Sequence, residues 1–407
     1  MKKRYIIFGL IAFSQSIKAQ TLSDSSFEKK KLSKTSIEFS FSYYNQDGKN
    51  SAVTGGIGSE KLSVYAPELT ISHQFKKLNT FSLNAGIDII TSASTDKIDF
   101  VVSSASYKDQ HVHADVSYQR QLKKIDLKIG GAAGISIESD YTAFPVSFSL
   151  NYTEPSKMRS YQIGINCSFD DLRWGRYDGN ANGKSVLVYP AELRYKEWYD
   201  VYRRNTYNIK LGFTQVLSKK MTIGIFPEFI YQQGLLATPF HRVYFNDNSL
   251  RVENLPKQRF RFPVAIKLNA FIGSRFILKN QYSFYADNFG IIANAIEIEG
   301  ALKIVPQFTV GSFFRFYHQS ASRYFKPYKE HQTDENFYTC DYDLSRFNSY
   351  KAGVSLKFFP ISKMQKKIFF ENILLRYSFY YRSNHLQAHT ATFAFTFASE
   401  YVKKKRL

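Results

Sequence analysis

The sequence predicts an all-β chain: a transmembrane antiparallel β-barrel of about 16 strands, with about 14 as the alternative count. Segment after segment alternates apolar and polar residues with a period of two, which is the strand period. Aromatic residues make up 17% of the 407 residues, yet the mean hydropathy is polar, at -0.32. A membrane barrel needs both properties, because one strand face meets lipid and the other meets water.

The N-terminus has the three parts of a secretory signal in residues 1–19. Lys2, Lys3 and Arg4 are followed by a short apolar run and by Ala19 as a cleavage point. An uncleaved interfacial helix is the alternative. We therefore expect a signal peptide at 1–19, a short periplasmic segment at 20–35, the barrel at 36–400 and a basic periplasmic tail at 401–407.

The strands follow from the alternation. The segment SIEFSFSYY, residues 36–44, places Ile, Phe, Phe and Tyr on one face and Glu, Ser and Ser on the other. Strands are expected to begin near residues 36, 62, 80, 110, 124, 144, 160, 206, 221, 260, 275, 291, 307, 349, 370 and 389. The strand near 291 is weakly patterned, which leaves the count of about 14 open.

The connections between these strands alternate between long and short, as in outer-membrane barrels with short periplasmic turns and long outer loops. Lysine pairs recur in the short turns, at 76–77, 123–124, 219–220 and 366–367. Arginines recur in the outer loops, at positions 203, 204, 242, 251 and 259. The net charge of +21 is therefore expected to face outer-membrane lipid and lipopolysaccharide phosphates. The export signal argues against nucleic acid as the partner.

The polar faces of the strands carry charges of opposite sign in the two halves of the chain. The early, acidic set is Glu38, Glu68, Asp88, Asp115, Asp126 and Asp170. The later, basic set is Lys210, Lys267, Lys279, Arg315, Lys351, Lys357 and Arg376. If the first and last strands close the barrel, acidic and basic walls face each other across the lumen and orient charged solutes. A network of salt bridges that only fills the interior is the alternative.

Small hydroxyl residues and carboxylates gather at the expected outer mouth. The stretch 92–109 contains Ser-Ala-Ser twice, each followed by an aspartate. A tight approach of two strand tops and a rim site for a ligand or cation both fit this pattern. The candidate rim residues are Ser92, Ser94, Asp96, Ser104, Ser106, Asp109, Asp341 and Asp343.

His111, His113 and Asp115 share one strand face at two-residue spacing, which is a weak candidate for a shared metal and is otherwise polar lumen lining. The chain has no GxSxG, HExxH or P-loop motif. We therefore expect no catalytic residue, metal site or cofactor. A barrel hydrolase stays open because His241, His318 and many serines could meet in the fold.

Several short motifs occur together in order and resemble one outer-membrane family, catalogued as domain of unknown function 3570. They are the SASxD-type repeat with Asp109, ESDY at 138–141, ATPFHRVYF at 237–245, FPVAIKLN at 262–269, YADNFGI at 285–291, FRFYHQSASRYF at 314–325 and CDYDLSRF at 340–347. The resemblance implies a barrel in the outer membrane of a Gram-negative bacterium. It implies no catalytic residue, because the family has no established activity. It also suggests a redox-linked periplasmic partner, such as a flavoprotein, by association.

Three hypotheses for function remain at this stage. The first is a channel or transporter for small charged solutes. The second is a structural barrel that holds a periplasmic partner. The third is a barrel hydrolase.

Overall fold

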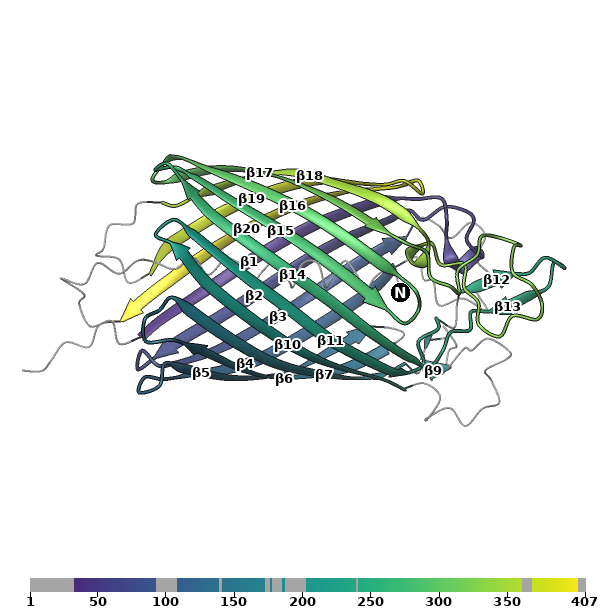
Figure 1. Cartoon of the computed structure of the whole chain (residues 1–407), viewed down its shortest axis with the longest axis horizontal. Helices are drawn as coiled ribbons and strands as arrows, with labels where there is room; N and C mark the ends of the chain where they lie inside the picture. The colour runs from purple at the N-terminus through teal and green to yellow at the C-terminus, as the bar shows by residue number, and fades with distance from the viewer. Residues whose placement is uncertain are drawn as a thin grey trace, which may run out of the picture.

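The computed structural model describes residues 33–92, 108–138, 141–172, 176–177, 185–186, 203–238, 241–360 and 368–401. Sixteen antiparallel strands close into one barrel (Figure 1), which confirms the predicted fold class and the higher of the two strand counts. The segments predicted as signal peptide, at 1–19, and as basic tail, at 401–407, lie outside the described residues, except for Tyr401, which ends the last strand. The barrel begins at Ser33, three residues before the predicted boundary at 36.

The strands of the ring follow the chain order. They are β1 (Ser33–Asp47), β2 (Leu62–Phe75), β3 (Asn79–Ser92), β4 (Lys108–Leu122), β5 (Leu127–Glu138), β6 (Tyr141–Thr153), β7 (Arg159–Asp171), β10 (Arg203–Ser218), β11 (Met221–Gly234), β14 (Gln258–Ile272), β15 (Phe276–Asp287), β16 (Ile292–Val305), β17 (Phe308–Gln319), β18 (Phe347–Phe358), β19 (Ile368–Arg382) and β20 (Leu386–Tyr401). Two small hairpins lie outside the ring, β8 (Arg176–Tyr177) with β9 (Ser185–Val186) and β12 (Arg242–Tyr244) with β13 (Leu250–Val252).

The barrel closes between its first and last strands. Strand β1 pairs with β20 from Ser33 opposite Tyr401 to Asp47 opposite Gln387. Both described ends of the chain therefore lie at the same end of the barrel. The fully described turns at this end are short, and Lys76 and Lys77, between β2 and β3, have positive φ values of 51° and 58°. Closure leaves no unpaired sheet edge, which a strand structure in a membrane requires.

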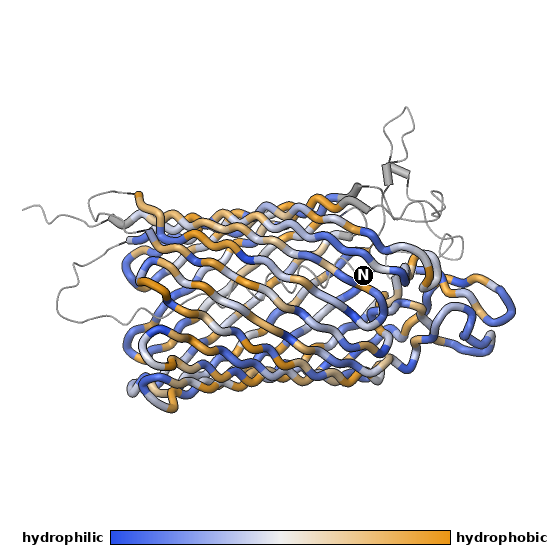
Figure 2. The backbone as a smooth tube through the Cα atoms, turned by 90° about the horizontal axis from the view of Figure 1, so that it is seen from above, coloured by the Kyte–Doolittle hydropathy of each residue, from blue (hydrophilic) through white to orange (hydrophobic). Residues whose placement is uncertain are grey.

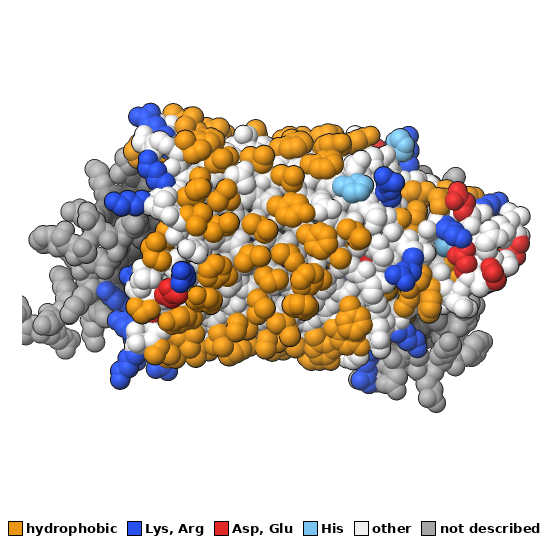
Figure 3. Space-filling model, viewed as in Figure 1, with side chains coloured by type: hydrophobic (Ala, Val, Ile, Leu, Met, Phe, Trp, Pro, Cys, Tyr) orange, Lys and Arg blue, Asp and Glu red, His pale blue; other side chains and the backbone are white. Residues whose placement is uncertain are grey.

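The outer surface of the barrel is apolar. On β4 the side chains of Val112, Val116 and Tyr118 are 46%, 44% and 43% exposed, while His113, Asp115 and Ser117 alternate with this face and point inward. Hydrophobic and hydrophilic positions alternate along the strands (Figure 2). Apolar side chains cover the middle of the barrel, with lysine and arginine concentrated towards its two ends (Figure 3). Such a band with charged rims matches a bilayer.

Helix is almost absent from the described residues. Two short 3₁₀ turns are present, η2 (Ala52–Thr54) and η5 (Tyr342–Leu344). No described helix is both long and apolar enough to cross a membrane.

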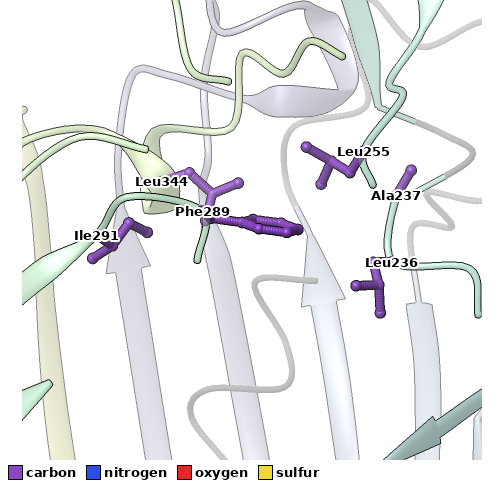
Figure 4. Packing of buried hydrophobic residues seen from close by; sticks show 6 residues of the cluster. All are labelled: Leu236, Ala237, Leu255, Phe289, Ile291 and Leu344. Carbon is purple, nitrogen blue, oxygen red and sulfur yellow. The ribbon is translucent and has the colours of Figure 1, made fainter. Parts of the chain in front are cut away.

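The buried apolar core lies mainly at one end of the molecule, opposite the described ends of the chain. One cluster consists of Leu236, Ala237, Leu255, Phe289, Ile291 and Leu344 (Figure 4). A second consists of Val243, Phe245, Tyr338 and Cys340. These residues come from connections between strands, so the long loops form a packed structure of their own.

Candidate functional site

A folded cap lies at the long-loop end of the barrel. We use the name cap for residues 48–61, 235–238, 241–257, 288–291 and 320–346. Its segments join through backbone bridges, Phe245 with His331 and Asn254 with Tyr338. The side chain of Arg251 lies over the Phe245 ring at 4.4 Å. Apolar packing and backbone pairing together hold these loops in one arrangement.

The cap crosses the mouth of the barrel. Gly55 lies in the β1–β2 loop, and a Cβ at this position would lie 2.5 Å from the ring of Tyr244, which belongs to the β11–β14 loop. Strands β1 and β11 are the first and ninth of the sixteen in the ring, so these loops rise from opposite walls. The thiol of Cys340, from the β17–β18 loop, donates to the carbonyl of Arg242 at 3.0 Å. Loops from three parts of the ring therefore meet above the lumen.

A buried carboxylate ties the cap together. The side chain of Glu253 is fully buried and accepts hydrogen bonds from the Thr238 backbone N–H at 2.6 Å and from the Thr339 hydroxyl. His241 Nδ1 lies 3.4 Å from the same carboxylate. Burial alone would raise the pKa of Glu253, but the charge and hydrogen bond of His241 and the bonds from Thr339 and Thr238 outweigh it and lower the pKa. The ionised form of Glu253 therefore stabilises the cap.

Asp341 and Asp343, two of the predicted rim residues, have structural contacts inside the cap. Asp341 is 1% exposed and accepts from the Asp343 backbone N–H at 2.9 Å, which caps η5. The carboxylate of Asp343 forms an ion pair with Arg382 of β19 at 2.6 Å. These contacts anchor the β17–β18 loop to the barrel wall.

The other predicted rim residues, in the two Ser-Ala-Ser copies and their aspartates, lie mostly outside the described residues. Ser94, Asp96, Ser104 and Ser106 lie outside the described residues. Ser92 is the last residue of β3, and the backbone of Asp109 in β4 pairs with Ile90. The rim site at these positions stays a prediction.

The predicted lumen charges, with one exception, occupy inward positions of the barrel strands. Lys210 lies between Ile209 and Leu211, which are 47% and 39% exposed on the outer face. The same alternation directs these side chains inward: Glu38, Glu68, Asp88, Asp115, Asp170, Lys210, Lys267, Lys279, Arg315, Lys351, Lys357 and Arg376. The exception is Asp126, where the prediction is wrong. Asp126 has a φ of 48° in the turn before β5, because that strand begins at Leu127 and not near 124.

The basic half of the barrel also contains acidic lumen residues that the sequence did not predict. Glu228 of β11 and Glu297 and Glu299 of β16 also point inward. Glu299 forms ion pairs with Lys279 at 2.7 Å and with Arg376 at 3.7 Å. The alternation along β16 could have identified Glu297 and Glu299 as inward residues. The alternation is weak, however, because alanines occupy several positions of this strand. The two walls are therefore less purely acidic and basic than predicted.

Charges of both signs nevertheless lack an ion-pair partner within the described part of the lumen. On the acidic half these are Glu38, Glu68 and Asp115, and on the basic half Lys210, Lys267, Arg315, Lys351 and Lys357. Glu68 accepts instead from the Asn84 side-chain amide at 2.5 Å, and Lys267 lies over the Phe226 ring at 5.2 Å. Salt bridges thus neutralise only part of the lumen, and a transverse separation of charge remains.

Two arginines that were predicted to contact lipopolysaccharide point into the barrel instead. Arg204 and Arg259 are 9% and 6% exposed. Arg204 pairs with Asp170 and Arg259 pairs with Asp287, both on inward strand faces. The prediction that these two bind membrane phosphates is wrong, because the strands begin early enough to place both residues inside the barrel wall.

A histidine cluster lies on the inner wall near the capped end. His111 of β4 is 2% exposed, and its Nδ1 lies 3.0 Å from an oxygen of Asp88 on β3. Its Nε2 lies 2.7 Å from the hydroxyl oxygen of Ser136 on β5. The ring of His113 stacks on that of His111 with centroids 5.5 Å apart. The cluster joins three neighbouring strands and includes Asp88, whereas the sequence spacing had suggested Asp115.

Comparisons with known proteins give one family match and several solved structures of low sequence identity to this chain. A family model described as "Protein of unknown function (DUF3570)" matches residues 102–384. OccK1 (OpdK) of Pseudomonas aeruginosa has 9% identity and a TM-score of 0.41 over 91% of this chain and 99% of that chain. OccAB4 of Acinetobacter baumannii has 8% identity and a TM-score of 0.42 over 92% and 100%. A BenF-like porin of Pseudomonas fluorescens Pf-5 has 9% identity and a TM-score of 0.41 over 89% and 98%. No curated protein matches the sequence.

Proposed function

The chain belongs to the family of proteins of unknown function DUF3570, and from that starting point we propose that it is an outer-membrane channel for small charged solutes. The observation that carries the proposal is a closed ring of sixteen strands with an apolar outer face and a lumen face that bears charges of both signs. Barrels of 16 to 18 strands are wide enough to enclose water. The chemistry of the wall then determines which solutes cross.

The outer surface supports the membrane location. Burying the exposed apolar side chains of the band in lipid removes them from water, at roughly 25 cal/mol for each Å². The Lys76–Lys77 and Lys219–Lys220 turns lie at the end of the barrel where the described part of the chain begins and ends. We assign this end to the periplasm, where the lysines would meet anionic head groups. The cap would then face the outside.

The lumen supports a preference for charged solutes. Opposite charges on two walls produce a field across the pore, and the low-dielectric barrel wall strengthens it. A solute with separated positive and negative groups would align with this field during passage. The cap crosses one mouth, so the solutes that enter are small.

Single-channel recording from the purified protein in planar bilayers tests the proposal. We expect discrete conductance steps, with an ion preference that moves towards cations in the double variant Lys210→Glu with Lys267→Glu. The shift should be on the order of 2-fold to 5-fold in the permeability ratio at about 0.1 M salt, where screening is modest. The matched control is Lys219→Glu with Lys220→Glu, which reverses the same number of charges in a turn outside the lumen. Absence of conductance from correctly folded protein would refute a channel.

A further inference from the structure

The histidine cluster offers three metal-binding side chains from two neighbouring strands. We propose that Asp88, His111 and His113 bind one divalent transition-metal ion, such as Zn²⁺, on the lumen wall beside the capped mouth. One ligand atom from each side chain lies within 4.8 Å of the other two. Two imidazoles and a carboxylate are a donor set that suits zinc, and an open fourth position is typical of sites that also hold water or a passing ligand.

The distances need only a small adjustment to become coordination bonds. Asp88 Oδ2 and His111 Nδ1 are 3.0 Å apart. Two ligands about 2.1 Å from the same zinc ion are separated by this distance when the angle at the metal is about 90°. For a triangle with 4.8 Å sides, the centre lies about 2.8 Å from each corner, so each ligand atom moves by less than about 1 Å to reach bonding distance.

His113 supplies the second, independent observation. Its Nδ1 is buried and has no hydrogen-bond partner within the described residues. A buried polar atom without a partner destabilises the fold, and a bound ion would offset this cost. The ring lies over Gly86 of β3, where a Cβ would come within 2.8 Å of His113 Nε2. The absence of a side chain at Gly86 therefore lets His113 lean towards the strand that carries Asp88.

Ser136 would orient His111, one of the metal-binding side chains, through a hydrogen bond. When His111 binds the ion through Nδ1, its Nε2 carries a proton and can donate to the Ser136 hydroxyl, 2.7 Å away. A hydrogen bond to the second ring nitrogen fixes the orientation of a metal-binding histidine.

The same three residues, in the order Ser136, His111 and Asp88, also have the geometry of a nucleophile, a base and an orienting carboxylate. The surroundings favour the metal. Asp115 lies on the same face of β4 as His113, and Glu138 lies on the same face of β5 as Ser136. Extra carboxylates attract a cation, whereas they would oppose the negative charge that develops on an oxyanion during acyl transfer. Strand β5 is also paired along both edges, so its backbone N–H groups lie in the ladders.

Zinc titration of the full chain without a histidine tag, folded in detergent, tests the proposal. Isothermal titration calorimetry should show one Zn²⁺ ion bound per chain. Excess Mg²⁺ should not compete, because it prefers an all-oxygen site. His113→Ala should weaken Zn²⁺ binding by about 10-fold or more. Asp88→Asn should do the same, and either variant suffices if the other fails to form a heat-modifiable barrel. His318→Ala is the control, because that histidine bonds to Asn348 on β18, away from the cluster.

Three results would overturn the metal site. The first is wild-type protein that binds no Zn²⁺ saturably. The second is a His113→Ala variant that binds Zn²⁺ as tightly as the wild type. The third is covalent labelling of Ser136 by a fluorophosphonate at a rate that Zn²⁺ does not change, which would indicate the nucleophile instead. None of these results depends on ion conduction, so the metal site and the proposed channel are tested separately.

Discussion

Arg315 on β17 and Lys351 on β18 lie directly opposite each other, with both side chains in the lumen. Glu297 of β16 faces Arg315 from the other side, but no ion pair joins them in the described structure. Like charges at directly opposed strand positions are destabilising. The pair is therefore expected to lower the stability of the barrel.

Replacing one of these cations should therefore stabilise the barrel. We expect Lys351→Glu to raise the free energy of unfolding by about 0.2–1 kcal/mol, because an opposed pair of unlike charges replaces a pair of like charges. Urea unfolding in lipid vesicles measures the change.

The control for this change is Lys357→Glu, on the same strand and the same face. Lys357 is opposite Thr309 on β17, so no repulsion with that strand is relieved. An equal gain in both variants would show that the effect does not come from the Arg315–Lys351 contact.

The cap should limit conduction, since its loops come from opposite walls. Gly55 has a φ of 82°, and its missing side chain leaves room for the Tyr244 ring. Gly55→Ala should loosen the contact through both steric overlap and backbone strain of about 1–2 kcal/mol. We expect a larger single-channel conductance or a higher open probability.

Gly273→Ala is the matched control for the cap. Gly273 also has a positive φ, 62°, but nothing lies within 4 Å of a Cβ there. If protease digestion shows a loosened cap in Gly55→Ala while the conductance is unchanged, the cap does not restrict the pore.

The barrel was predictable because lipid and water impose a strict alternation on each strand. The predicted starts at 62 and 221 agree with those of β2 and β11. The prediction for Asp126 failed because the end of β4 and the following turn carry no clear change of pattern. The acids of β16 were missed for the same reason: a weakly patterned strand shows its inward face poorly.

The cap and the histidine cluster depend on contacts between segments that are separate in the sequence, and the pattern within one segment cannot predict such contacts. Gly55 meets Tyr244 only because their loops rise from opposite walls. Asp88 meets His111 because the register between β3 and β4 places them opposite each other. Spacing within one strand can identify His111 and His113 as neighbours on one face, but it cannot supply the register of the next strand.

The stability of the cap should fall in acid, and Glu335 shows why. Its carboxylate accepts from the Lys326 ammonium group and from the Gln332 backbone N–H, and it lies 2.7 Å from His331 Nδ1. Burial raises the pKa of Glu335, but these contacts outweigh it and lower the pKa from 4.5 to about 2. A carboxyl group whose pKa is lower in the folded state stabilises that state above its unfolded pKa.

The stabilisation of the cap by the ionised Glu335 carboxylate should be complete at neutral pH and should be lost as the pH falls from about 4.5 towards about 2. Hydrogen exchange of residues 320–346, corrected for the intrinsic rate at each pH, measures it. Glu335→Gln should reduce protection at neutral pH and flatten its decline in acid. Part of the decline should remain, because the pKa of Glu253 is also lowered. Glu330→Gln, at an exposed position in the same loop, should behave as the wild type. A decline that is just as steep in Glu335→Gln as in the wild type would assign the acid sensitivity to other groups.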